Sequence, residues 1–237
     1  MKNFFDGIDE LTPEYERFVN SVERVRSDFP SLWALAGKAC AMSQMLVRIS
    51  SESPVIRGHE NGLSLLGIWN RIINYQKNSF FLLVGNQINE GLAILRMAAE
   101  STFILKACCV SSENLLLFVD SGVPKDKGFK EAGKMDLEDP TQKTVFDLYN
   151  YCSRYGVHGH ITSELHSEPF DPVHGQSDYS ASIYLKIWLT HFVAPHRFAF
   201  EHLWKDGPFE GIEEWRSEIT GIELDLLKSI RTEGFFR

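Results

Sequence analysis

Residues 88–110, INEGLAILRMAAESTFILKACCV, constrain the fold of this chain more than any other segment. A helix drawn through them is apolar on nearly every face, and such a helix is typical of positions that other helices surround. Arg96, Glu100 and Lys106 interrupt it, and no apolar run approaches the ~20 residues that span a bilayer. We therefore expect this helix at the centre of a soluble bundle without membrane contact.

The apolar periodicity of the other segments is also helical, and no sustained alternation indicates strands. Gly85 and Asn86 predict a reversal between a long helix that starts near Leu63 and the helix at 88–110, because both residue types accept the left-handed conformation that ends helices. We expect an all-α single domain, residues 1–237, with about six to eight helices around this antiparallel hairpin. Its parts are N-terminal helices in 1–62, a core bundle in 63–205 and a last helix in 206–237.

Capping patterns predict where several other helices begin. Thr12, which proline follows, predicts a helix through about Asp28, and Ser31 predicts a second helix to about Ser50. Asp139, which proline also follows, predicts a helix that ends near Arg154. A polar segment, residues 121–139, precedes this helix, and we expect a mobile loop there.

A long apolar helix is expected from about residue 180 to residue 204, and Pro195 lies inside it. Proline has no backbone N–H, so the carbonyl of His191, four residues earlier, loses its helical donor. This predicts a kink at that turn.

The overall charge limits the kinds of partner that we expect. A formal net charge of −8 works against broad, sequence-independent binding to nucleic acid, which relies on many Lys and Arg contacts. A small local basic site is compatible with it. The cysteines, Cys40, Cys108, Cys109 and Cys152, show no paired spacing, and the N-terminus has no secretory pattern. We therefore expect reduced thiols and a cytoplasmic protein.

The segment YNYCSRYGVHGHITS, residues 149–163, combines side chains that suit phosphate chemistry. His158 and His160 can carry protons near neutral pH, and Arg154 can stabilise negative charge on a phosphate. These three residues are candidate catalytic or anion-binding groups. In the alternative interpretation, Arg154 caps the last carbonyls of its helix and the histidines make ordinary loop hydrogen bonds.

A metal site is a further alternative, since His158, His160, Glu164 and His166 lie close together in sequence. The other histidines are His174, His191, His196 and His202. No HExxH or paired CxxC pattern is present, so we expect no metal and no cofactor, and we interpret His191 and His196 as core histidines. Ser153 lacks the GxSxG turn of a serine nucleophile.

Arg96 and Glu100 stand four residues apart and so share a helix face. One interpretation is a buried structural ion pair, which would be costly to break. The other is an anion clamp in which Arg96 faces a cleft and Glu100 holds it in place.

Three stretches together resemble a known family: LRMAAESTFILKA, YNYCSRYGVHGH and the long helix that follows. They are similar to an uncharacterised all-helical bacterial family with a HEPN-like bundle, in which an Arg-x3-Glu helix precedes a Ser-x4-His segment. The resemblance covers residues 63–205 and matches Arg96, Glu100, Ser153 and His158 to the motif positions.

The wider HEPN superfamily includes metal-independent ribonucleases whose motif is Arg, four to six residues, and His. Arg154 and His160, with five residues between them, fit this spacing, whereas Tyr155 stands where a polar residue is usual. The resemblance implies RNA as a partner, a homodimer that forms the site, Arg154 as phosphate clamp, and His160 as general acid or base. His158 would then be a second proton carrier.

Three functions follow from these patterns. The first is a HEPN-like ribonuclease or RNA-interacting protein, which needs Arg154 and His160 in one cleft. The second is a non-catalytic helical interaction protein or small-anion-binding protein, in which the histidines are incidental. The third is a metal-dependent hydrolase, which needs three ligands converging on one ion.

Overall fold

The computed structural model describes residues 8–52, 61–122, 124–154, 178–203 and 212–233. These residues are helical with short connections and include no strand, which confirms the all-α prediction. They form nine α-helices, more than the six to eight expected. The helices are α1 (Ile8–Asp28), α2 (Pro30–Glu52), α4 (Gly62–Val84), α5 (Ile88–Val110), α6 (Ser112–Ser121), α7 (Lys127–Ala132), α8 (Pro140–Cys152), α9 (Asp178–Phe198) and α10 (Ile212–Glu233); a π-helical turn, η3 (Ala199–Leu203), follows α9.

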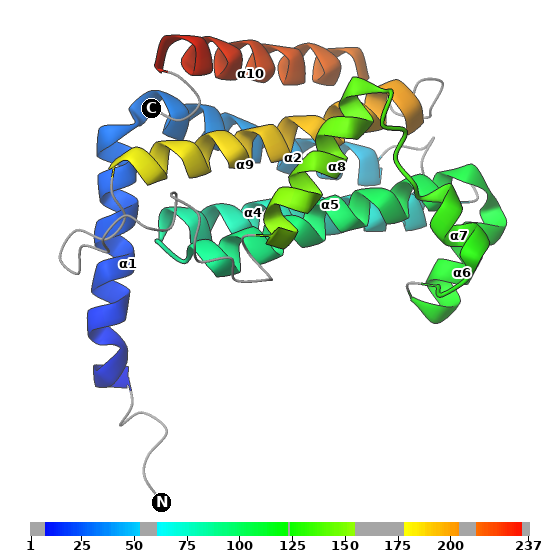
Figure 1. The fold of residues 1–237 in the computed structure, drawn as a ribbon, viewed down its shortest axis with the longest axis horizontal. Helices are drawn as coiled ribbons and strands as arrows, with labels where there is room; N and C mark the ends of the chain where they lie inside the picture. The colour runs from blue at the N-terminus through cyan, green and yellow to red at the C-terminus, as the bar shows by residue number, and fades with distance from the viewer. Residues whose placement is uncertain (1–7, 53–60, 123, 155–177, 204–211, 234–237) are drawn as a thin grey trace, which may run out of the picture.

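Helices α4 and α5 form the predicted antiparallel hairpin (Figure 1). Asn86 has the left-handed φ of 64° that the reversal requires. The amide of Gly85 donates to the carbonyl of Phe81 at 2.9 Å and closes the end of α4. At the start of α5, a Cβ on Gly91 would lie 2.7 Å from the Leu83 side chain, so glycine allows the two helices to approach closely.

The most enclosed helix is α9, and the prediction that α5 occupies this position is wrong. Every side chain from Ser182 to Phe198 is buried except those of Thr190 and Arg197, whereas Glu100 of α5 is exposed. Helix α9 packs against α4, α8, α2 and α10, and it lies between the α4–α5 hairpin and α10 (Figure 1). An apolar helix that other helices surround is therefore present, but it is α9 and not α5.

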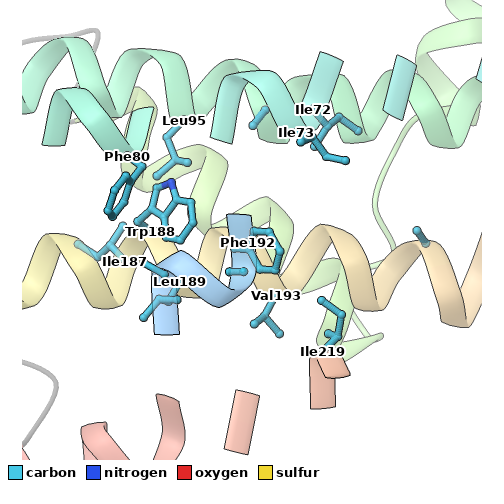
Figure 2. Close-up of a cluster of buried hydrophobic side chains, with 14 of the residues drawn as sticks. Ile72, Ile73, Phe80, Leu95, Ile187, Trp188, Leu189, Phe192, Val193 and Ile219 are labelled. Atoms are coloured by element: carbon cyan, nitrogen blue, oxygen red, sulfur yellow. The ribbon is translucent and has the colours of Figure 1, made fainter. Parts of the chain in front are cut away.

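Aromatic side chains join α9 to the hairpin. Figure 2 shows Trp188 extending from α9 toward Phe80 and Leu95. The ring centroids of Trp188 and Phe80 are 5.0 Å apart, and those of Trp188 and Phe192 are 5.7 Å apart. Ile219 belongs to α10, which covers the opposite side of α9. Burial of large side chains on two sides accounts for the position of α9, at roughly 1.5–3 kcal/mol for each fully buried side chain.

Pro195 is accommodated by a hydrogen bond from another helix. The assigned helix α9 continues through Pro195 to Phe198. The carbonyl of His191, which Pro195 cannot reach with an N–H, instead accepts a hydrogen bond of 2.8 Å from Nε2 of Gln76 in α4. In return, Nε1 of Trp188 donates to the backbone carbonyl of Gln76 at 2.7 Å. The two helices are thus joined at the proline by hydrogen bonds in both directions.

Two sequence predictions about local structure were wrong. Helix α1 begins at Ile8 and not at Thr12. The segment 121–139 is not a continuous loop, because it contains α7, whose N-cap residue Asp126 accepts a hydrogen bond from the amide of Phe129 at 2.9 Å. Phe129 is 4% exposed and anchors α7 to the core. The buried Phe129 and the Asp126 cap thus give local structure to a segment that is polar overall.

Candidate functional site

A cavity of about 540 Å³ lies between α5, α7, α8 and the connection from α7 to α8. This volume falls within the roughly 300–1,000 Å³ that is usual for small-molecule sites. Its lining is mainly apolar, with charged groups contributed by one glutamate and two lysines. The lining residues are Glu100, Phe103, Ile104, Pro124, Phe129, Lys130, Gly133, Lys134, Met135, Leu137 and Phe146.

The walls of the cavity come from helices whose packing fixes them independently of the cavity. Phe103 and Ile104 follow Glu100 by three and four residues and so lie on the same face of α5. Phe146 lies on α8, and Phe129 holds α7 to the core. Helices α8 and α7 both contact α5 directly. Helices that pack directly on one another therefore form the walls of the cavity on three sides.

The connection from α7 to α8 is fastened to α5 by Lys106. The ammonium of Lys106 donates to the backbone carbonyl of Lys134 and to Oε1 of Gln142, the latter at 2.8 Å. The amide of Asp136 donates to the same Gln142 oxygen at 3.0 Å. Partial burial lowers the pKa of Lys106, while Asp136 and Asp139 act in the opposite direction. This network holds the segment that closes one side of the cavity.

Gly133 brings the same connection against the backbone of α5. A Cβ at this position would lie 2.9 Å from the carbonyl oxygen of Phe103, closer than real Cβ contacts come. The φ of Gly133 is −82°, which any residue adopts, so the requirement for glycine is the close approach alone. Glycine here sets the width of the cavity on the α5 side.

Arg96 and Glu100 contact each other beside the cavity, but they are not a buried pair. Nη2 of Arg96 lies 3.9 Å from Oε1 of Glu100, and the side chains are 26% and 48% exposed. Arg96 also donates to the hydroxyl of Tyr149 at 3.2 Å, and its guanidinium carbon lies 5.2 Å from the centroid of that ring. The hydrogen bond that Arg96 donates to Tyr149 is the main reason that the pKa of Arg96 is raised. The expectation of a buried ion pair is therefore wrong, and the main partner of Arg96 is an aromatic residue of α8.

Tyr149 connects Arg96 and Glu100 to the cavity wall. The sequence did not identify Tyr149 as a site residue. The rings of Tyr149 and Phe103 lie 5.2 Å apart. Glu100 lines the cavity and contacts Arg96, so these residues form one continuous edge. The i, i+4 spacing of Arg96 and Glu100 was visible in the sequence, but the contact with Tyr149 depends on how α8 crosses α5.

Of the expected phosphate site, the structure describes Arg154, at the end of α8 and next to the other candidate residue Ser153. Ser153 and Arg154 continue α8 as a π turn. Arg154 is exposed, and the hydroxyl of Ser153 is buried without a hydrogen-bond partner among the described residues. His158 and His160 lie outside the described residues, so the predicted Arg154–His160 site remains a prediction.

Cys152 and His191 meet in the interior, where neither is suited to catalysis. The Cys152 sulfur lies 3.3 Å from Nε2 of His191. Burial lowers the pKa of His191 to about 3 and raises that of the Cys152 thiol well above its usual range. The thiol therefore stays protonated and the imidazole stays neutral, whereas nucleophilic cysteines require the thiolate.

His196 is enclosed by aromatic rings, and burial lowers its pKa to about 3. Its ring stacks on Phe192 at 4.2 Å and meets Trp69 edge-on at 4.8 Å. Nδ1 of His196 hydrogen-bonds the Phe192 carbonyl, whereas Nε2 has no partner among the described residues. The prediction that His191 and His196 are core histidines is confirmed.

No group of three metal-ligating side chains occurs in the part of the chain that the structure describes. The sequence cluster of His158, His160, Glu164 and His166 lies outside that part, as does His174; the side chain of His202 is also not described. The metal-site alternative at those positions therefore remains a prediction.

A second cavity, of about 280 Å³, lies between α8, α9 and α10. Its main charged groups already pair with each other, because Arg197 contacts both Glu201 and Glu223 at 2.8 Å. The hydroxyl of Thr141 donates to Glu201 at 2.8 Å. This arrangement joins three helices and leaves the charges of Arg197 satisfied within the protein, which favours a structural role.

Neither family models, nor curated proteins, nor solved structures match this chain significantly. The HEPN-like resemblance therefore rests on its sequence motifs alone. Among the helices within the described ranges, none combines the length and the apolar character that are needed to cross a bilayer.

Proposed function

We propose that this chain is a binding protein that holds a small, largely apolar molecule in the cavity between α5, α7 and α8. The observation that supports the proposal is an apolar space of about 540 Å³ whose walls are fixed by core packing. A ligand that enters this space makes dispersion contacts with the side chains that line it. Apolar surface that a ligand covers contributes roughly 25 cal/mol per Å².

The chemistry of the lining favours binding over catalysis. The described lining residues include Glu100, Lys130 and Lys134 as charged groups but no histidine or cysteine. Proton transfer near neutral pH relies mostly on histidine or on a carboxyl group with a perturbed pKa. The proposal thus develops the non-catalytic alternative that the sequence left open.

The test is titration of the purified chain with N-phenyl-1-naphthylamine, a neutral apolar dye whose fluorescence rises when it leaves water. We expect saturable binding to the wild type and its loss in Leu137→Trp, which places bulk at the mouth. Leu137 is 48% exposed, so the larger side chain does not disturb the core. Leu224→Trp is the matched control, because Leu224 is 53% exposed on α10, which does not line this cavity. Absence of saturable binding, or equal loss in both variants, would contradict the proposal.

A metal-independent ribonuclease is the second candidate, and the exposure of Arg154 at the end of α8 favours it. In that function Arg154 contacts a phosphate, His160 transfers the proton of a ribose hydroxyl, and two subunits complete the site. The test is cleavage of a labelled mixed-sequence RNA with and without EDTA, beside His158→Ala and His160→Ala. Cleavage that survives EDTA and disappears with one histidine supports this candidate. Loss of cleavage in EDTA would support the metal-dependent hydrolase, and no cleavage would leave the binding function.

A further inference from the structure

The rim of the cavity carries three charged side chains, and two of them have partners within the protein. Glu100 lies 3.9 Å from the guanidinium of Arg96. Lys134 lies 2.8 Å from the carboxylate of Glu131. Lys130 is exposed, and its ammonium contacts no carboxylate among the described residues. Lys130 is therefore the rim charge that is available to a ligand.

The backbone of Lys130 is held in place at the rim. Its amide donates to the carbonyl of Asp126 at 3.2 Å in the first turn of α7. The preceding residue, Phe129, is 4% exposed and packs in the core. An anchored backbone lets the flexible lysine stem lie along an apolar ligand while the ammonium stays in water.

We infer that the ligand of this cavity is an amphipathic monoanion, with an apolar body inside and a carboxylate or similar acid group at Lys130. This inference rests on the proposed binding function. The two lysines and one glutamate give the rim an excess of one positive charge. Arg96 beside Glu100 further offsets the charge that would repel an anion. An anion would pair with the exposed ammonium of Lys130, whereas an uncharged ligand would gain nothing from its charge.

A cationic ligand, such as an amine, is the competing alternative. Phe103, Phe129 and Phe146 line the cavity with Glu100, and aromatic faces attract cations. An amine would need Glu100, whose carboxylate is already beside Arg96, and its approach would bring it near Lys130 and Lys134. The rim charges therefore favour the acid over the amine.

The experiment compares three ligands of equal chain length as competitors of N-phenyl-1-naphthylamine: octanoate, 1-octanol and octylamine. We expect octanoate to displace the dye at a lower concentration than 1-octanol, by roughly two- to fivefold, which is the strength of an exposed ion pair. Octylamine should be the weakest. Added salt should reduce the advantage of octanoate and leave 1-octanol unchanged.

Lys130→Gln should abolish the preference for octanoate over 1-octanol, measured in the same variant as the ratio of the two concentrations that displace the dye. Lys127→Gln on the same helix is the matched control, because Lys127 is exposed and does not line the cavity. Equal displacement by the three ligands, or strongest displacement by octylamine, would overturn the inference but not the binding function. Failure of the neutral dye to bind would refute the binding function itself, and the inference with it.

Discussion

Gln76 and Pro195 should be energetically coupled, because the Gln76 side chain supplies the donor that the proline removes. In the wild type, the His191 carbonyl accepts from Gln76 Nε2 at 2.8 Å. Gln76→Met keeps the approximate size of the side chain but leaves that carbonyl without its donor. An unsatisfied buried polar group costs about 1–3 kcal/mol.

A double-mutant cycle isolates this cost. Oε1 of Gln76 is buried without a partner among the described residues, so its removal is favourable and masks part of the loss in the single variant. Removal of this unpaired oxygen is equally favourable in a Pro195→Ala background. In that background, however, the alanine N–H can donate to the His191 carbonyl in place of Gln76. Gln76→Met should therefore destabilise the wild type by about 1–3 kcal/mol more than it destabilises Pro195→Ala.

The measurement is urea unfolding followed by circular dichroism for the wild type, both single variants and the double variant. Gln44→Met, at an exposed position of α2, is the control for the change in side-chain chemistry. For a chain of this length, 1 kcal/mol corresponds to roughly 2–4 °C in Tm, so thermal melts provide a second reading. A coupling energy below about 0.5 kcal/mol would refute the reasoning, because independent sites add to within that margin.

Three further predictions concern acid stability and the cavity walls. The pKa of His191 and of His196 is about 3 in the folded chain against 6.5 when exposed, so the unfolded state binds more protons below pH 6.5 and the free energy of unfolding falls as the pH drops. Each histidine changes the free energy of unfolding by at most about 1.4 kcal/mol per pH unit. His196→Phe should remove one of these contributions, so unfolding measured at several pH values should give a shallower dependence of that free energy on pH. Lys106→Met should lower the free energy of unfolding by about 1–2 kcal/mol and weaken dye binding. Unchanged dye affinity would mean that the α7–α8 connection does not depend on this lysine. Gly133→Ala should lower the free energy of unfolding by about 1–3 kcal/mol, because the added Cβ meets the Phe103 carbonyl. Gly67→Ala, whose Cβ meets nothing within 4 Å, should raise it by about 0.5–1 kcal/mol. The reverse order of stability in urea denaturation would contradict the packing argument.

The parts of the fold that depend on local chemistry were predictable from the sequence. Gly85 and Asn86 placed the hairpin turn, and Asp139, whose side chain accepts from the Gln142 amide at 2.8 Å, placed the start of α8. The relative burial of α5 and α9 was not predictable. Polar residues interrupt the apolar sequence of both helices, yet Lys186 and His191 of α9 are fully buried. Whether a polar side chain can be buried depends on groups far away in sequence.

The candidate site could not be predicted from the sequence either, because it also depends on residues far apart in the chain. Its walls come from residues between Glu100 and Phe146 on three helices, and no local pattern marks them as neighbours. The pairing of Arg96 with Glu100 followed from helical spacing, but its exposure and its bond to Tyr149 follow from the crossing of α8 over α5. Phe129 and the capping residue Asp126 were the available signals for α7, and one apolar residue after one cap in a polar stretch carries little weight.

The central position of α9 has a consequence for how the chain is made. The α4–α5 hairpin is complete at Val110, but the helix that covers its inner face ends at Phe198. At translation rates of about 5–20 residues per second, the ribosome needs roughly 4–18 s to synthesise the intervening chain. Throughout that interval Phe80 and Leu95 lack the Trp188 that packs on them in the finished protein (Figure 2). The nascent hairpin therefore exposes these apolar side chains for seconds before α9 can cover them.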